Sequence, residues 1–237
     1  MYGGGYVARA AKELRRAHPR LNFSVSSGNG EDILAHLREG TLDLGVLVGP
    51  GRYEGFDYLT LPYTHHWGLA VEKDSPLAAK KSISAKDARE IPLICSRQGM
   101  VKEFLAGWFG CPFGKLDVVA TYNLIYNAAV FVEAGLGAAI CIDEMIPQEF
   151  ANRVVFRPFA PALVSDVYLA WRKNAAPHLL QVPSSMQSEG CRQSDSQASQ
   201  STFWLSMLRR AFVDLTAAAP SFFAKRLVGC LAPKAQE

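Results

Sequence analysis

Residues 26–50, SSGNGEDILAHLREGTLDLGVLVGP, decide how the chain folds, because they read in succession as loop, helix, turn and buried strand. Glu31 and Asp32 stand in the first turn of the predicted helix, where carboxylates favour the positive end of the helix dipole. Gly40 has the place of a C-cap glycine, and residues 42–48 then read as a strand buried on both faces. The stretch predicts either an ordinary βαβ unit or one whose loop holds a small anion at the helix N-terminus.

The composition is that of an ordinary folded protein. Its 237 residues, 49% apolar and 20% charged, suffice for one large or two small domains. The formal net charge of +3 is too small to predict a nucleic-acid surface. Without a long apolar run or a signal peptide, we expect a cytoplasmic protein that does not contact a membrane. Five cysteines without CxxC spacing indicate reduced thiols. A basic cluster favours a solvated helix face: Lys12, Arg15, Arg16 and Arg20.

Strand and helix patterns alternate along most of the chain, which predicts an α/β fold. The first block has a helix over 6–17, the helix and strand of the opening stretch, and strands over 57–62 and 67–71. The second block has strands over 91–95, 116–120 and 138–142 and helices over 101–108, 124–133 and 143–150. Late strands over 154–156 and 167–171 are left to return to the first block. We therefore expect two lobes of mixed, mostly parallel sheet flanked by helices, with a ligand cleft between them.

We expect lobe I to comprise residues 1–71 and 151–174, and lobe II to comprise residues 72–150. We expect residues 175–237 to form an atypical, partly disordered tail, because serine and glutamine are frequent over residues 181–202 and no apolar period is visible there. Within the tail, residues 203–219 have a helical stripe and residues 221–231 a weaker one.

Several stretches resemble the effector-binding domain of LysR-type transcriptional regulators, which has the periplasmic-binding-protein type 2 fold. The resemblance runs from about residue 6 to residue 173. Its carriers are HPRLNFSVSSGNGEDILAHLREGTLDLGVLVGP (18–50), KDSPLA (73–78), IPLICSRQ (91–98), VATYNLIYNAAVFVEAGLGAAICID (119–143) and FRPF (156–159). The resemblance implies a small-molecule effector and a homo-oligomer formed through this domain. It also implies that DNA is contacted only through a winged helix-turn-helix, which this sequence lacks, so we expect no direct DNA contact from this chain.

Both ends of the sequence depart from the family pattern. The chain begins where the family's first core strand should just have ended, so residues 3–5 would be the loop after a missing strand. The family usually finishes with one helix, not with a stretch rich in serine and glutamine. A truncated or frame-disrupted reading frame would explain both departures.

The resemblance places the effector pocket between the lobes, on loops that follow strands. In this sequence those loops contain eight polar candidates: Ser27, Asn29, Ser96, Arg97, Gln98, Thr121, Tyr122 and Asn123. Each cluster also follows an apolar strand and opens a helix, so backbone N–H groups and side-chain donors should point into one crevice. Arg97 could pair with a carboxylate, which predicts a small anionic metabolite. The alternatives are N-capping for Ser27 and Asn29, a surface or inter-lobe salt bridge for Arg97, and lobe packing for Tyr122.

Enzymatic and cofactor-dependent functions have little support. His65 and His66 are adjacent on a strand and so point to opposite faces, and no third metal ligand has a recognisable spacing. Cys95 would need a lowered thiol pKa and a nearby histidine to act as a nucleophile. We predict no catalytic residue, no metal and no cofactor. Two other functions stay open: a solute-binding protein of a transport system on the same fold, and a truncated, non-functional fragment.

Overall fold

A computed structural model of the chain describes residues 3–17, 19, 22–49, 53–173 and 224–229. The strands are β1 (Asn22–Ser26), β2 (Leu44–Gly49), β3 (Phe56–Glu72), β4 (Leu93–Ser96), β5 (Val118–Tyr122), β6 (Ala138–Ile142), β7 (Val154–Pro158), β8 (Val164–Arg172) and β9 (Ala224–Gly229). The helices are α1 (Gly3–Ala17), α2 (Gly30–Glu39), α3 (Ala85–Arg89), α4 (Gly99–Phe109) and α5 (Ile125–Glu133). Short 3-10 turns occur at η1 (Pro76–Ala79), η2 (Phe113–Lys115) and η3 (Gln148–Phe150), the last within the helix predicted over 143–150.

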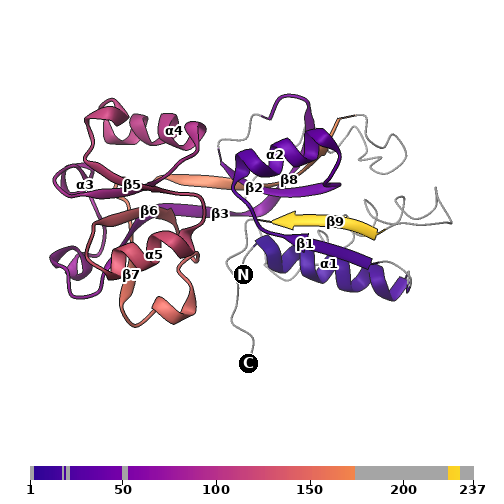
Figure 1. The fold of residues 1–237 in the computed structure, drawn as a ribbon, viewed down its shortest axis with the longest axis horizontal. Coiled ribbons are helices and arrows are strands. Elements are labelled where there is room, and N and C mark those ends of the chain that lie inside the picture. Colours follow the sequence, from indigo (N-terminus) through magenta and orange to yellow (C-terminus); the bar gives the residue numbers. More distant parts are fainter. Residues whose placement is uncertain (1–2, 18, 20–21, 50–52, 174–223, 230–237) are drawn as a thin grey trace.

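The described strands form one mixed sheet in the order β1-β9-β2-β8-β3-β6-β4-β5, with β7 paired to β3 beside that path (Figure 1). Parallel pairs lie within each lobe, where β9 joins β1 to β2 and β4 joins β5 to β6. The pairs that involve β3 or β8 are antiparallel. The structure is therefore the predicted α/β fold with a mixed sheet flanked by helices.

The strand β3 belongs to both lobes. Residues 56–66 pair with β8 in lobe I, and residues 67–72 pair with β6 and β7 in lobe II. The sequence predicted two strands over 57–62 and 67–71, but the residues between them keep pairing with β8, after a register shift between Thr60 and Thr64. We therefore place the crossing between lobes near His66, earlier than the expected boundary at residue 71, and β7 lies with the strands of lobe II.

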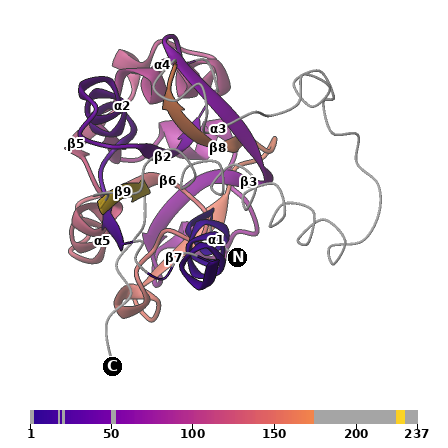
Figure 2. The same cartoon turned by 90° about the vertical axis from the view of Figure 1, so that its right-hand side faces the viewer.

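Helices cover both faces of the sheet in each lobe (Figure 2). In lobe I, α1 packs on one face in a cluster that includes Leu14 and Val46. The helix α2 packs on the other face, where Leu37 contacts a cluster that includes Leu47. In lobe II, α4 and α5 cover opposite faces in the same way. Because neighbouring residues of a strand point to opposite faces, the strand predicted to be buried on both faces over 42–48 is explained by helices on both sides of β2.

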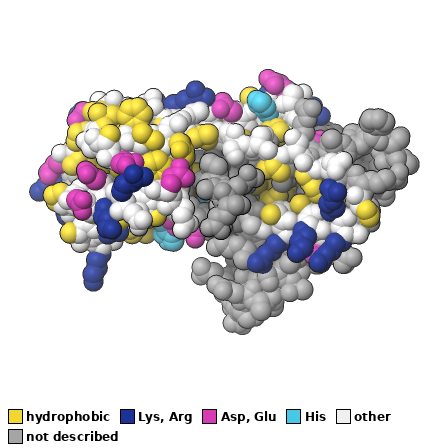
Figure 3. All heavy atoms as spheres, turned by 60° about the horizontal axis from the view of Figure 1, so that its bottom comes forward, with side chains coloured by type: hydrophobic (Ala, Val, Ile, Leu, Met, Phe, Trp, Pro, Cys, Tyr) yellow, Lys and Arg dark blue, Asp and Glu magenta, His cyan; other side chains and the backbone are white. Residues whose placement is uncertain are grey.

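The exposed face of α1 is basic. Arg9, Lys12, Arg15 and Arg16 are exposed, and Arg16 forms a 2.7 Å ion pair with Glu13. Figure 3, in which the lower side of Figure 1 comes forward, shows Lys and Arg side chains gathered on this part of the surface. The predicted solvated helix face is confirmed for these residues, whereas Arg20 lies outside the described residues. In the part of the chain that the structure describes, no helix is long and apolar enough to cross a membrane.

The place between β1 and β2 is filled by β9, which runs parallel to both. Asn22–Ser26 pair with Ala224–Val228 on one side of β9, and Leu44–Val46 pair with Leu227–Gly229 on its other side. The sequence predicted that the family's first core strand is missing; in the structure no gap is left beside β2, because β9 lies there. The weak helix predicted over 221–231 is wrong for residues 224–229, which form a strand. Residues 3–5, predicted as a loop, form the first turn of α1. The helix predicted over 203–219 and the rest of the predicted tail lie outside the described residues.

The close approach of α2 to β2 gives a first prediction. A Cβ at Gly45 would lie 2.6 Å from Ile33 Cγ2 and 3.0 Å from Leu37 Cδ1, so Gly45→Ala should lower the free energy of unfolding by about 1–3 kcal/mol. The control is Gly107→Ala in α4, where nothing lies within 4 Å of an added Cβ; alanine should raise the same quantity by about 0.5–1 kcal/mol. Urea denaturation measures both, and a stabilising effect of Gly45→Ala would contradict the packing.

The position of β9 gives a second prediction. Leu227 pairs with Val25 on one side and with Leu44 on the other, so a proline there would sit in the middle of the sheet without an N–H to donate. We expect Leu227→Pro to lower the free energy of unfolding by about 3 kcal/mol, measured by urea denaturation. Leu227→Val keeps the N–H and a residue favoured in strands, and should cost under about 1.5 kcal/mol. Equal stability of the two variants would show that β9 is not part of the sheet.

Candidate functional site

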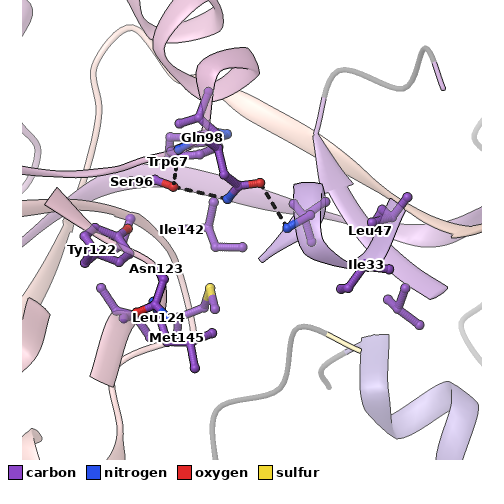
Figure 4. A pocket seen from close by; sticks show the side chains of 16 residues that line it. Ile33, Leu47, Trp67, Ser96, Gln98, Tyr122, Asn123, Leu124, Ile142 and Met145 are labelled. Carbon is purple, nitrogen blue, oxygen red and sulfur yellow. Dashed lines mark hydrogen bonds between the residues drawn. The ribbon is translucent and has the colours of Figure 1, made fainter. Parts of the chain in front are cut away.

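A pocket lies between the lobes, where loops at the ends of strands meet (Figure 4). It encloses about 650 Å³ of space not filled by atoms, part of it open to solvent. Lobe I lines it with Gly30, Ile33, Val46, Leu47 and Val48. The crossing strand β3 adds Trp67, and lobe II adds Ser96, Gln98, Val101, Tyr122, Asn123, Leu124, Ile125, Cys141, Ile142 and Met145. A molecule in this pocket would touch both lobes at once.

Half of the predicted site residues line the pocket, namely Ser96, Gln98, Tyr122 and Asn123. The other half do not. Ser27, Arg97 and Thr121 are exposed outside the lining, and Asn29 is buried behind it with 1% of its surface exposed. The loops are brought together as expected, but only some of their polar side chains point inward.

The N-terminus of α2 is bound by groups from both lobes. Asn29 is its N-cap, and the Asn29 Oδ1 atom accepts a hydrogen bond from the Asp32 backbone N–H at 3.0 Å. The Gly30 backbone N–H donates across the cleft to Gln98 Oε1 at 3.0 Å. Gln98 is held in turn, because its Nε2 atom donates to Ser96 Oγ at 3.1 Å (Figure 4). For Asn29, the capping alternative is therefore the observed arrangement.

The N-terminus of α4 is bound from lobe I in return. The Gly99 backbone N–H donates to Glu31 Oε1 at 2.8 Å, which places a carboxylate at the positive end of the helix dipole. At the third helix beside the pocket, α5, no side chain caps the first turn, but the N–H of the N-cap residue Leu124 donates to Asn123 Oδ1 at 2.9 Å. At each helix N-terminus where the sequence predicted room for a small anion, a protein oxygen already accepts a backbone hydrogen bond.

Arg97 pairs with the opposite lobe at the surface. Its NH2 nitrogen lies 3.3 Å from Asp32 Oδ1 and 3.4 Å from Asp32 Oδ2. The Arg97 and Asp32 side chains are 53% and 48% exposed, so the pair contributes under about 1 kcal/mol. This is the inter-lobe salt bridge named as the alternative for Arg97, and it holds the guanidinium outside the pocket.

The aromatic and sulfur groups of the lining are neutral, and the aromatic polar ends are already bonded. Trp67 Nε1 donates to Ser165 Oγ at 2.8 Å, and the Tyr122 hydroxyl donates to the Ile140 carbonyl at 2.6 Å. Burial raises the pKa of Cys141 to about 12, so its thiol is uncharged. These three side chains therefore offer a ligand mainly apolar surface.

Cys95 is not an activated thiol, and the described residues hold no cluster placed to bind a metal ion. Burial raises the pKa of Cys95 to about 12, only partly offset by Lys102, whereas an active nucleophile needs a lowered pKa. Among the residues that the structure describes, no group of three or more His, Cys, Asp or Glu side chains is placed to hold a metal ion.

The family model described as the LysR substrate binding domain matches residues 1–182. The chain belongs to this family. Among curated proteins it is similar to the uncharacterized HTH-type transcriptional regulator YvbU of Bacillus subtilis, with 25% identity over 166 residues, 70% of this chain and 56% of that protein. It is also similar to the HTH-type transcriptional regulator CbbR of Cereibacter sphaeroides, with 24% identity over 164 residues, 68% of this chain and 52% of that protein. The chain thus spans about half the length of these relatives.

Solved structures of LysR regulators share the fold. The effector binding domain of QuiR in complex with shikimate aligns with a TM-score of 0.62 and 18% identity, over 89% of this chain and 93% of that chain. HinK, a LysR family regulator from Pseudomonas aeruginosa, aligns with a TM-score of 0.58 and 16% identity, over 88% of this chain and 65% of that chain. The likeness confirms the predicted fold of LysR effector-binding domains, the periplasmic-binding-protein type 2 fold.

Sequence reasoning missed the apolar part of this LysR pocket. Met145 follows the end of β6 just as Gln98 follows β4, so the same strand-end rule could have found it. Trp67 had no such signal, because it lies inside β3 and reaches the pocket only where that strand changes lobe. Polar residues attract attention in a loop, whereas apolar lining residues cannot be told from core residues by pattern alone.

Where β3 changes lobe, a hydrogen-bonded cluster joins β3 to the residue that follows β6. Asp143 Oδ1 lies 2.6 Å from His65 Nδ1, and Asp143 Oδ2 lies 3.2 Å from His66 Nδ1. On the other side of the His65 ring, Nε2 lies 3.2 Å from the Tyr63 hydroxyl. Both histidines thus reach one carboxylate, although the strand pattern placed them on opposite faces. Burial raises the pKa of Asp143, but hydrogen bonds from the two histidines outweigh it and hold that pKa below its usual value.

The cluster gives a pH prediction. A lowered pKa in the folded state means that the Asp143 carboxylate stabilises the fold above its ordinary pKa of 3.8, and that this stabilisation is lost as the pH falls through the folded value. Asp143→Asn should therefore lower the free energy of unfolding by about 1 kcal/mol at pH 7 and by much less near pH 3. Urea denaturation at both pH values measures the difference from the natural chain. Asp117→Asn, at an exposed position, is the control, and a pH-independent loss in Asp143→Asn would contradict the prediction.

Proposed function

We propose that this chain is the effector-sensing domain of a LysR-type transcriptional regulator, and that it binds a small molecule in the pocket between its lobes. The observation that carries the proposal is that the two lobes of a LysR substrate-binding domain jointly line this pocket. The proposed action is binding without chemistry, by a protein that works in the cytoplasm.

Signalling would proceed through the bonds that cross the mouth of the pocket. The bonds from Gly30 to Gln98 and from Gly99 to Glu31 join the lobes, and Gly30 and Gln98 themselves line the pocket. A ligand that contacts both lobes has different affinities for arrangements in which these bonds are made or broken, and so shifts the population between them. In the proposed regulator this shift alters how the subunits of a homo-oligomer are arranged, and thereby transcription. DNA would be contacted by a helix-turn-helix that the described residues do not contain.

The sequence-based expectation of an anionic metabolite gains no support from the geometry, because Arg97 is held outside the lining by Asp32. The transport alternative, a solute-binding protein on the same fold, is less well supported, because the curated relatives named above are transcriptional regulators.

A thermal-shift screen of small metabolites against the whole chain tests the proposal. A true ligand should stabilise the protein progressively, by about 2.7 kcal/mol at a concentration 100 times its Kd. Leu124→Trp, at a half-buried lining position, should fill the pocket and weaken that ligand at least tenfold by calorimetry, a loss of about 1.4 kcal/mol. Val130→Trp introduces the same side chain on the exposed side of α5, outside the lining, and should leave the affinity unchanged. If both variants bind the ligand as the natural chain does, the pocket is not the sensing site.

A further inference from the structure

The described lining of the inter-lobe pocket carries no formal charge. Its polar side chains are those of Ser96, Gln98 and Asn123, together with the hydroxyl of Tyr122, which is bonded to the Ile140 carbonyl. The remaining lining side chains are aliphatic, aromatic or sulfur-containing, and the Cys141 thiol is protonated. A charged ligand would therefore lose its hydration without gaining a partner of opposite charge, which is strongly unfavourable.

At each of the three helix N-termini beside the pocket, one backbone donor is already bonded to a protein oxygen. The Gly30 N–H is bonded to Gln98 Oε1, and the Leu124 N–H is bonded to Asn123 Oδ1. At α4 the Gly99 N–H is bonded to the Glu31 carboxylate, so a ligand carboxylate at this helix would approach a group of its own charge. A ligand anion would have to break these bonds to use these three N–H groups.

We propose that the effector of this pocket is an uncharged, mainly apolar molecule that carries a ring and one or two hydrogen-bonding groups. This inference rests on the proposed function. The ring would lie against Trp67 and Tyr122, whose own polar ends are bonded to the protein and whose rings offer apolar surface. The hydrogen-bonding group would accept from the Ser96 hydroxyl or from the Asn123 amide nitrogen, because the oxygens of both side chains already accept bonds from the protein.

The test compares carboxylic acids with the primary amides of the same acids, which have nearly the same size and shape but no charge. Suitable pairs are benzoate and benzamide, phenylacetate and phenylacetamide, 4-hydroxybenzoate and 4-hydroxybenzamide, and cyclohexanecarboxylate and its amide. Each compound is screened with the whole chain by thermal shift at pH 7.5, where the acids are ionised, and hits are measured by calorimetry. We expect the hits to be amides, with each acid partner at least tenfold weaker.

Two variants report on charge at the pocket. Met145→Lys introduces an ammonium group at a half-buried lining position and should remove the preference for the amide, because the acid of a pair should bind at least tenfold more tightly than before. Arg97→Ala removes a cation outside the lining and should change the affinity of either partner less than twofold. The comparison of pairs on the natural chain stands by itself if Met145→Lys does not fold.

The outcomes separate this inference from the proposed function. If acids bind as tightly as their amides or more tightly, and Leu124→Trp prevents their binding, the proposal of an uncharged effector is wrong. The proposed sensing function then still stands. Loss of binding on Arg97→Ala overturns the inference in the same way. If no compound of the panel and no metabolite of the wider screen stabilises the chain, the sensor and its uncharged effector both fail.

Discussion

The extended strand β3 belongs to both lobes, and the position of the pocket follows from it. Its first part pairs with β8 and its last part with β6 and β7, so one continuous backbone sets how the two halves of the sheet face each other. Trp67 lines the pocket where β3 changes lobe. The bond between His65 and Asp143 ties the same point to the end of β6. A rotation of one lobe against the other would have to bend the chain here.

Above this crossing, the mouth of the cleft is held by helix capping that works in both directions. Gln98 of lobe II bonds the first amide of α2, and Glu31 of lobe I bonds the first amide of α4. Helix N-termini have unpaired amides that need acceptors, and here each lobe supplies an acceptor to the other. The same bonds that join the lobes also occupy the first amide of each of these two helices, and the described lining of the pocket is neutral and mostly apolar.

The site was only partly predictable, for reasons that differ between residues. Ser96 and Gln98 line the pocket because they follow a buried parallel strand, and this place can be inferred from the chain alone. Arg97 stands between them in sequence but points to Asp32, because adjacent side chains diverge at the end of a strand. The Asn29 side chain caps the N-terminus of α2 and so does not line the pocket. Whether a polar residue caps, pairs or faces a ligand depends on neighbours that are 65 or more positions away, as in the contacts of Arg97 and Gln98.

By itself the sequence determined the α/β class, the helix and strand of residues 26–50 and the membership of the LysR family, because these depend on local periodicity, capping residues and short motifs. Only the tertiary structure decided that residues 56–72 form one strand shared by two lobes and that β9 lies between β1 and β2. It also decided that the lining of the pocket is uncharged. Strand partners and the direction of a side chain depend on residues that are distant in sequence, so local patterns do not contain them.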